Sequence, residues 1–276
     1  MPGILYLVPT PIGNLGDLSD RIRQTLECAD FIAAEDTRVS LKLLNHLGLK
    51  KQLVSYYEHN RAESGPKILE RLLAGETCAL VTDAGTPAIS DPGEALVALC
   101  AEAGVPVCAI PGPCAVITAL AVSGLPTGRF TFEGFLSTSK KSRREHLESL
   151  RDERRTMIFY EAPHKLVQTL QDLSAAFGPD RRIALCRELT KLHEEILRMT
   201  LQEAVAFYGG QAPRGEYVLV LEGAPAPAAP AVTPEEAAAM VASRMSGGVS
   251  RKDAVRQVAR ESGIPRNILY DASLLL

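Results

Sequence analysis

The stretch that decides the fold is LVTDAGTPAISDPG, residues 80–93, where a short apolar run leads into a loop rich in proline, glycine, aspartate and hydroxyl side chains. The loop is too polar and too kinked for a strand or the interior of a helix. At the carboxyl end of a buried strand, such a loop faces the crevice in which open parallel sheets bind ligands. Gly85 lets a ligand approach the backbone closely, and Pro87 and Pro92 stiffen the loop.

The sequence around this loop predicts a parallel α/β domain over residues 1–125. Short apolar runs alternate with helical patterns such as SDRIRQTLECA, in which Ile22 and Leu26 are spaced for one helix face. Strands joined by helices favour a mostly parallel sheet with crossover helices. The expected strands are 4–8, 30–35, 53–57, 78–82 and 105–110.

A second α/β domain is expected over 126–222. Its later strands follow one another with fewer intervening helices, so we predict a mixed sheet. The expected strands are 129–135, 156–160, 182–186, 194–200 and 216–222.

The remainder of the chain predicts a linker and a small helical module. Residues 223–232 are rich in proline and alanine, which indicates a semi-rigid extended linker. Residues 233–276 predict short helices with turns like those of a helix-turn-helix unit. Thr233 and Glu236 have the spacing of a capping box at the start of the first helix.

Composition and charge exclude some classes of protein. The net charge of −3 gives no overall field towards nucleic acid, so any RNA binding must use local basic patches. No run of about 18 apolar residues occurs, and the N-terminus lacks a basic region, so we expect neither a membrane span nor a signal peptide. The six cysteines lack metal-ligand spacing and lie in apolar contexts. We therefore expect reduced thiols, no metal, and a cytoplasmic protein.

Four polar loops follow expected strands of the first sheet and so should share one edge of it. They contain neither G-x-G-x-x-G nor G-x-x-x-x-G-K-[ST], which argues against a dinucleotide or a nucleoside triphosphate. Their Asp, Ser and Thr side chains suit a ligand with hydroxyls, an amine and a positive centre. The loops are PTPIGN (9–14), EDTR (35–38), TDAGTPAISDPG (82–93) and PGPCA (111–115).

Six motifs in order carry a family resemblance: LVPTPIGNLGDLSDRI, IAAEDTR, TDAGTPAISDPG, IPGPCAVITAL, FEGFL and FYEAPHK. Together they resemble the small-subunit ribosomal RNA 2′-O-ribose methyltransferases of the tetrapyrrole-methylase superfamily. The resemblance implies a two-domain tetrapyrrole-methylase-like fold with a C-terminal helical module. It also implies S-adenosylmethionine between the two α/β domains, a homodimer, and a cytidine in the decoding region of 16S ribosomal RNA, within the small ribosomal subunit, as target.

Carried over residue by residue, the resemblance places the cofactor among the central loops and the start of FYEAPHK. The implied cofactor-binding residues are Pro9, Asp83, Gly85, Thr86, Pro87, Ile89, Ser90, Cys114, Ala115, Tyr160, Glu161, Ala162 and Leu189.

Methyl transfer to a ribose hydroxyl needs positioning and, because the hydroxyl is a poor nucleophile, a nearby base or cation. Glu35, Asp36, Glu161 and Lys165 are expected near the cleft, and of these we take Glu35, Asp36 and Lys165 as the catalytic candidates. The lysine could act as a base only with a depressed pKa. An alternative for Glu35, Asp36 and Arg38 is a salt bridge that caps the next helix.

Basic residues near the cleft and in the C-terminal module are candidate phosphate contacts. Each of these basic groups could instead be a solvated surface, and Asp83 and Asp91 could simply brace their own loop. The candidate RNA contacts are Arg38, Lys140, Lys141, Arg143, Arg144, His164, Arg251, Lys252 and Arg256.

Three function classes stay open at this point: an RNA ribose methyltransferase, a methylase of a small molecule such as a tetrapyrrole, and a non-catalytic RNA-binding protein. The basic segments 140–144 and 251–256 argue against the second class. The intact cleft loops argue against the third.

Overall fold

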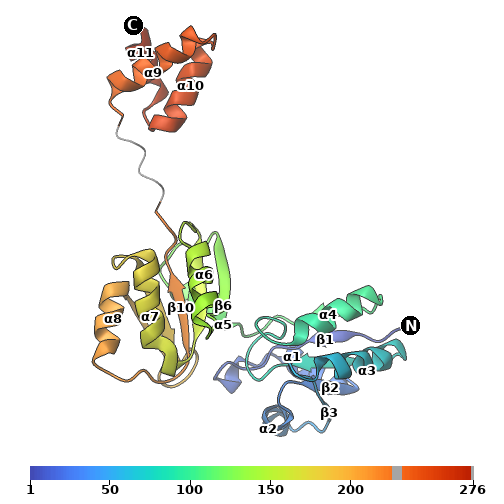
Figure 1. The fold of residues 1–276 in the computed structure, drawn as a ribbon. Coiled ribbons are helices and arrows are strands. Elements are labelled where there is room, and N and C mark those ends of the chain that lie inside the picture. The colour runs from blue at the N-terminus through green and yellow to red at the C-terminus, as the bar shows by residue number, and fades with distance from the viewer. Residues whose placement is uncertain (226–231, 275–276) are drawn as a thin grey trace. The chain divides into compact units, whose positions relative to one another are not determined.

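The computed structural model describes residues 1–225 and 232–274, which form two compact units, Met1–Ala224 and Pro225–Leu276. Both predicted sheets lie in the first unit (Figure 1). Most of the linker predicted at 223–232 lies outside the described residues, as do the last two residues of the predicted helical module.

The first sheet is fully parallel, as predicted, with the strand order β3-β2-β4-β1-β5. Every residue of β2 and β4 is buried, because helices cover both faces of the sheet. The strands are β1 (Leu5–Leu7), β2 (Phe31–Ala34), β3 (Gln52–Ser55), β4 (Cys78–Val81) and β5 (Val107–Ala109).

Helices pack on the two faces of this sheet through separate apolar clusters. Ile22 and Leu26 of α1 and Leu44 of α2 cover one face, and Ile68 of α3 and Leu96 of α4 cover the other. The helices are α1 (Asp20–Cys28), α2 (Thr37–Leu47), α3 (Arg61–Leu73) and α4 (Gly93–Glu102), with a 3-10 helix, η1, at Leu15–Asp17.

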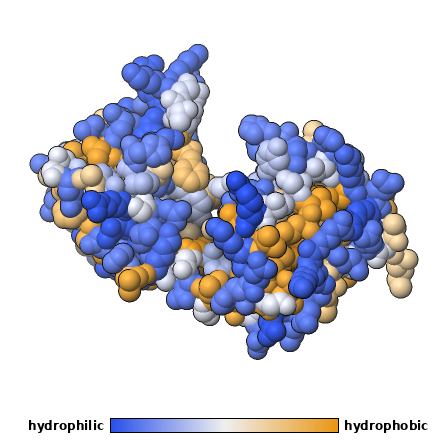
Figure 2. All heavy atoms as spheres, turned by 90° about the horizontal axis from the view of Figure 1, so that it is seen from below, coloured by the Kyte–Doolittle hydropathy of each residue, from blue (hydrophilic) through white to orange (hydrophobic). Residues whose placement is uncertain are grey.

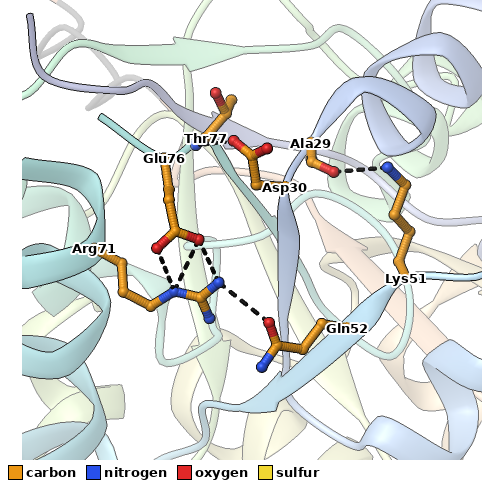
Figure 3. A network of polar contacts seen from close by, with 7 residues as sticks. All are labelled: Ala29, Asp30, Lys51, Gln52, Arg71, Glu76 and Thr77. Carbon is orange, nitrogen blue, oxygen red and sulfur yellow. Dashed lines mark hydrogen bonds and ion pairs between the residues drawn. The ribbon is translucent and has the colours of Figure 1, made fainter. Parts of the chain in front are cut away.

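A polar network closes the amino ends of the central strands (Figure 3). Arg71 of α3 pairs with Glu76 at 2.5 Å and donates to Gln52 Oε1 at 3.2 Å. Its guanidinium also lies 3.5 Å from the ring centroid of Phe31, the first residue of β2. These polar groups brace the edge of the sheet opposite the predicted ligand loops.

The second sheet is mixed, as predicted, with the order β6-β7-β10-β8-β9. Only β6 and β7 are parallel neighbours, and the other pairs are antiparallel. The strands are β6 (Phe130–Phe135), β7 (Thr156–Glu161), β8 (Arg182–Arg187), β9 (Glu195–Thr200) and β10 (Tyr217–Leu221). The helices that follow β6, β7 and β9 are α6 (Lys140–Ser149), α7 (Pro163–Phe177) and α8 (Leu201–Gly209).

One face of the second sheet packs against α7 and α8, and the other packs against α5 (Ala115–Val122). Val116, Ala119 and Leu120 of α5 contact an apolar cluster that includes Ile158 of β7 and Val218 of β10. Helix α5 thus ends before residue 125, but it packs against strands that come after residue 125 in the chain. This arrangement brings the loop after β5 next to the second sheet.

The second unit contains three helices among its described residues: α9 (Pro234–Ser246), α10 (Arg251–Ser262) and α11 (Arg266–Leu274). Thr233 and Glu236 form a reciprocal capping box at the start of α9. Val241, Val258 and Leu269 are fully buried at its core. In the described part of the chain, no helix is both long and apolar enough to cross a membrane.

Candidate active site

A hollow of about 570 Å³ lies between the two sheets of the first unit. One wall is formed by the loops after β2, β4 and β5, at the carboxyl ends of the parallel strands. The other wall is formed by the ends of strands in the second sheet and by the loop before β9. The predicted ligand loops therefore meet at one site, where the opening stretch of sequence supplies much of the first wall.

Hydrogen bonds fasten the loops of the first wall to one another. Thr10 and Gly85 exchange backbone hydrogen bonds at 2.9 and 3.0 Å. Thr10 Oγ1 donates to the carbonyl of Thr82 at 3.0 Å, and Thr86 Oγ1 donates to the carbonyl of Pro113 at 2.8 Å. Backbone and hydroxyl hydrogen bonds thus connect the segments after β1, β4 and β5 into one wall.

Strained backbone occurs in a loop on each side of the hollow. Ala88 and Ser90 have φ angles of 68° and 65°, and Glu188 and Thr190 have φ angles of 52° and 67°. Left-handed backbone costs a residue with a Cβ roughly 1–2 kcal/mol, and such residues cluster at functional sites. The two strained segments shape the loops that carry Ile89 and Leu189 into the lining of the hollow.

Carboxylates line the first wall. Glu35 Oε2 accepts from Thr82 Oγ1 at 2.6 Å, and Asp83 Oδ1 accepts from the Asp36 backbone amide at 3.1 Å. Burial and the nearby Glu35 raise the pKa of Asp91 to about 6. The same two causes raise the pKa of Asp83. This wall consequently favours a ligand group with positive charge.

The second wall combines an aromatic ring with a buried carboxylate. Tyr160 lies at the end of β7, where its ring centroid is 5.4 Å from that of Phe135, and burial raises its pKa. Glu161 is 4% exposed and accepts from the Ala162 amide at 2.8 Å and from Thr169 Oγ1. Lys191 also lines this wall.

The implied cofactor residues gather at the hollow, except for Pro9 and Pro87, which are buried and do not line it. Those lining it are Asp83, Gly85, Thr86, Ile89, Ser90, Cys114, Ala115, Tyr160, Glu161, Ala162 and Leu189. Lining residues that the sequence did not assign to the cofactor are Ile12, Glu35, Thr82, Ala84, Asp91, Phe135, Pro163, Cys186, Lys191, Glu216, Tyr217 and Val218. Many of the latter come from the second sheet, where no polar loop motif marks the strand ends.

The three catalytic candidates are separated in the structure. Glu35 lines the hollow, whereas Asp36 caps α2 by accepting from the Arg38 amide at 2.8 Å. Asp36 also pairs with the Arg38 guanidinium at 2.6 Å, and the hydrogen bonds from Arg38 lower its pKa to about 2. Asp36 and Arg38 thus form the helix-capping salt bridge that the sequence offered as an alternative, while Glu35 accepts hydrogen bonds from Thr82 and Asp83 instead. Lys165 lines a different hollow.

This second hollow, of about 730 Å³, lies between α6 and α7 and is called the basic hollow below. Its basic lining residues are Lys140, Arg143, Arg144, His164 and Lys165. Lys141 lies outside the lining, and its side chain is exposed.

Arg143 differs from its basic neighbours, because its side chain is 13% exposed and already has protein partners. Its Nε donates to Asp172 at 2.6 Å, and its Nη2 donates to Thr169 Oγ1 at 2.8 Å. The paired guanidinium is thus poorly available to a phosphate.

In the second unit, Arg256 pairs with Asp253 at 2.7 Å and lines a hollow of about 460 Å³ at the turn between α10 and α11. Arg260 and Arg266, which the sequence analysis did not assign to RNA, line the same hollow. Arg251 and Lys252 lie outside it, in the first turn of α10.

The hollow between the sheets fits S-adenosylmethionine in volume and chemistry. Small-molecule and cofactor sites span about 300–1,000 Å³ and combine an apolar lining with a few polar groups. Ile89, Tyr160 and Leu189 offer apolar surface, and the carboxylates suit the ammonium and sulfonium charges. The acidic lining residues are Glu35, Asp83, Asp91, Glu161 and Glu216, and among the described residues Lys191 is the single lysine or arginine of the lining.

Comparisons with known proteins agree with this fold and site. Residues 4–205 match the family model for Tetrapyrrole (Corrin/Porphyrin) Methylases. Two relatives named ribosomal RNA small subunit methyltransferase I are similar over nearly the whole chain. The one from Synechocystis sp. is 50% identical over 99% of this chain and 98% of its own. The one from Bacillus subtilis is 44% identical over 98% and 94%.

A solved structure shows the same fold: uroporphyrin-III C-methyltransferase from Thermus thermophilus, complexed with S-adenosylhomocysteine. It is 20% identical, with a TM-score of 0.54, over 80% of this chain and 97% of that one. Fold and family together define an S-adenosylmethionine-dependent methyltransferase.

The chain belongs to the tetrapyrrole methylase family and, within it, to the group named ribosomal RNA small subunit methyltransferase I. The predicted fold class, family and cofactor are confirmed.

Proposed function

We propose that the protein transfers a methyl group from S-adenosylmethionine to the ribose 2′-hydroxyl of a cytidine in the decoding region of small-subunit ribosomal RNA. The observation that carries the proposal is the adjacency of the two hollows in the first unit. Glu161, Ala162 and Pro163 line the cofactor hollow, and the next two residues, His164 and Lys165, line the basic hollow. An RNA bound at the basic hollow could therefore place a ribose next to the methyl donor in the cofactor hollow.

Bound S-adenosylmethionine supplies an electrophilic methyl group, so the protein has to orient the hydroxyl and receive its proton. Of the three candidate catalytic residues, Glu35 alone lines the cofactor hollow. Among the described residues, its hydrogen bonds from Thr82 and Asp83 both reach Oε2. We assign to Glu35 Oε1 the role of accepting the proton that the substrate hydroxyl loses.

The phosphate contacts are assigned to Lys140, Arg144, His164 and Lys165 of the basic hollow, with Lys141 beside it. Lysine and arginine contacts to phosphate position an RNA without reading its sequence. In the second unit, Arg251, Lys252 and the arginines at the α10–α11 turn add a further contact surface.

A homodimer and a cytoplasmic location complete the proposal. Large apolar side chains are exposed at Leu192 (92%) and Ile117 (52%), and burial of such groups against a second copy is favourable. On the face drawn in Figure 2, which is mostly hydrophilic, apolar residues gather in patches. The six cysteines are all free thiols, as expected in a reducing compartment. Light scattering of the purified protein tests the dimer.

The test of the reaction is methyl transfer from labelled S-adenosylmethionine to purified small subunits from cells that lack the enzyme, followed by nuclease digestion and mass spectrometry. The expected result is one ribose-methylated cytidine. Subunits from cells that contain the enzyme are the matched control and should take up no label.

A methylated base, or no transfer to the subunits, would contradict the assignment of the ribose hydroxyl. Methyl transfer to a tetrapyrrole precursor, which the small-molecule alternative requires, would replace it. Whichever of these results is found, binding of S-adenosylmethionine would still identify the cofactor hollow.

A further inference from the structure

A chain of hydrogen-bonded polar side chains connects the cofactor hollow with the basic hollow. Glu161 lines the first hollow, and Thr169, Arg143 and Asp172 line the second. Thr169 Oγ1 donates to Glu161 Oε2, Arg143 Nη2 donates to Thr169 Oγ1 at 2.8 Å, and Arg143 Nε donates to Asp172 Oδ2 at 2.6 Å. The chain joins α6, α7 and the end of β7.

The chemistry of the donors fixes the direction of every bond in this chain. A guanidinium has five donors and no acceptor, so the Thr169 oxygen accepts from Arg143. The hydroxyl has a single proton, which is directed to Glu161. The carboxylate of Glu161 thus receives one hydrogen bond from Thr169 and one from its neighbouring amide, at Ala162.

Burial makes these bonds costly to lose. Thr169 is 0% exposed, Glu161 is 4% exposed and the Arg143 side chain is 13% exposed. A buried donor or acceptor left without a partner costs about 1–3 kcal/mol, and more when it is charged. The corner between β7 and α7, which lines the cofactor hollow at residues 161–163, is therefore held from the side of α6.

We propose that Thr169 and Arg143 are positioning residues of the cofactor site. They hold the Glu161 carboxylate and the β7–α7 corner in place, and they act through Glu161 rather than on RNA. This assigns Arg143 a different role from its neighbours Lys140 and Arg144, although all three lie on one helix of the basic hollow. The proposal concerns cofactor binding and does not depend on which substrate is methylated.

The test measures binding of S-adenosylhomocysteine to the full-length protein by calorimetry, with no RNA present. Thr169→Val keeps the shape of the side chain and removes the hydroxyl, so Glu161 Oε2 loses its hydrogen bond from Thr169 and Arg143 Nη2 loses its acceptor, while the bonds to the Ala162 amide and to Asp172 stay. We expect about tenfold weaker binding or more, and we expect Thr169→Ser to restore most of the affinity. Affinity equal to wild type in Thr169→Val would overturn the proposal.

Arg143→Gln is the second variant and stays informative if Thr169→Val fails to fold. It should also weaken S-adenosylhomocysteine binding and raise the KM for S-adenosylmethionine, while the KM for small subunits stays close to wild type. Arg144→Gln is the matched control on the same helix, and it should leave S-adenosylhomocysteine binding unchanged. If Arg143→Gln instead weakens RNA binding and spares the cofactor, then Arg143 is an RNA contact and the proposal is wrong.

Discussion

Thr10 and Gly85 exchange two backbone hydrogen bonds between the loops that follow β1 and β4. Gly85 reaches this geometry with a φ of 87°, and a Cβ at this position would lie 3.3 Å from Ile12 Cγ2. The pair fixes the loop after β4 against the loop after β1 in the wall of the cofactor hollow.

Replacement of Gly85 by alanine should therefore affect both stability and cofactor binding. Left-handed backbone costs an alanine about 1–2 kcal/mol, and the contact with Ile12 adds to this. We expect a lower melting temperature and weaker S-adenosylhomocysteine binding. Gly48→Ala is the matched control, because Gly48 has a φ of 71° with nothing within 4 Å of the added Cβ. It should lower stability and leave binding unchanged; equal effects on binding would contradict a special role for Gly85.

Asp91→Asn should stabilise the free protein at pH 8 and have little effect near pH 4. The pKa of Asp91 is about 6 in the folded protein, above its ordinary value of 3.8. The folded state therefore binds the proton more tightly, and this stabilisation is complete below pH 4 and lost as the pH rises through 6. After allowance for solvent screening, the variant's free energy of unfolding at pH 8 should be higher by about 1 kcal/mol or less. This corresponds to a rise in melting temperature of roughly 2–4 °C.

Melting curves of wild type and Asp91→Asn between pH 4 and 8 check this sign. Asp36→Asn provides the opposite case, because the pKa of Asp36 is lowered to about 2 by its bonds from Arg38. Its contribution is present above the ordinary pKa and lost on acidification, so this variant should be less stable than wild type at neutral pH. If wild type and Asp91→Asn differed in melting temperature by the same amount at every pH from 4 to 8, the Asp91 carboxyl of the wild type would not be desolvated.

Glu35→Gln should lower kcat and spare cofactor binding. General base catalysis contributes about 10²- to 10⁴-fold, so a loss in this range is expected if Glu35 receives the hydroxyl proton. The amide keeps an oxygen for the hydrogen bond from Thr82. Asp36→Asn should keep activity close to wild type, because Asp36 lies outside the hollow and asparagine also caps helices well. Single-turnover rates on small subunits measure both variants, and the reverse order would assign the base to Asp36.

Arg144→Gln and Lys140→Gln should weaken binding to small-subunit RNA and reduce its dependence on salt. Each lost phosphate contact lowers the slope of log affinity against log salt by about 0.7–0.9. Lys42→Gln on α2 is the control, since this exposed lysine belongs to neither hollow. An unchanged slope in both variants would remove the basic hollow from the RNA-binding surface.

The strands and the first wall of the site could be predicted because local sequence marks them. All ten expected strands are present, and only β3, β7 and β8 extend one residue beyond their expected ranges, since buried apolar runs end in polar or glycine-containing turns. The second wall depends on pairing between distant strands, such as Tyr217 opposite Glu161, which no local pattern reveals. Likewise, the basic run at 140–144 gives no sign that Asp172 binds Arg143, so the sequence suggested an RNA contact where the structure shows an ion pair.

Deletion of residues 225–276 should weaken RNA binding and leave S-adenosylhomocysteine binding intact. Both walls of the cofactor hollow belong to the compact unit Met1–Ala224, and the three arginines at the α10–α11 turn belong to the other unit. A full-length variant with Arg256, Arg260 and Arg266 changed to glutamine separates loss of these charges from loss of the unit. It should reproduce most of the loss in RNA affinity, measured at fixed salt. Lost cofactor binding in the deletion would show that the second unit supports the first.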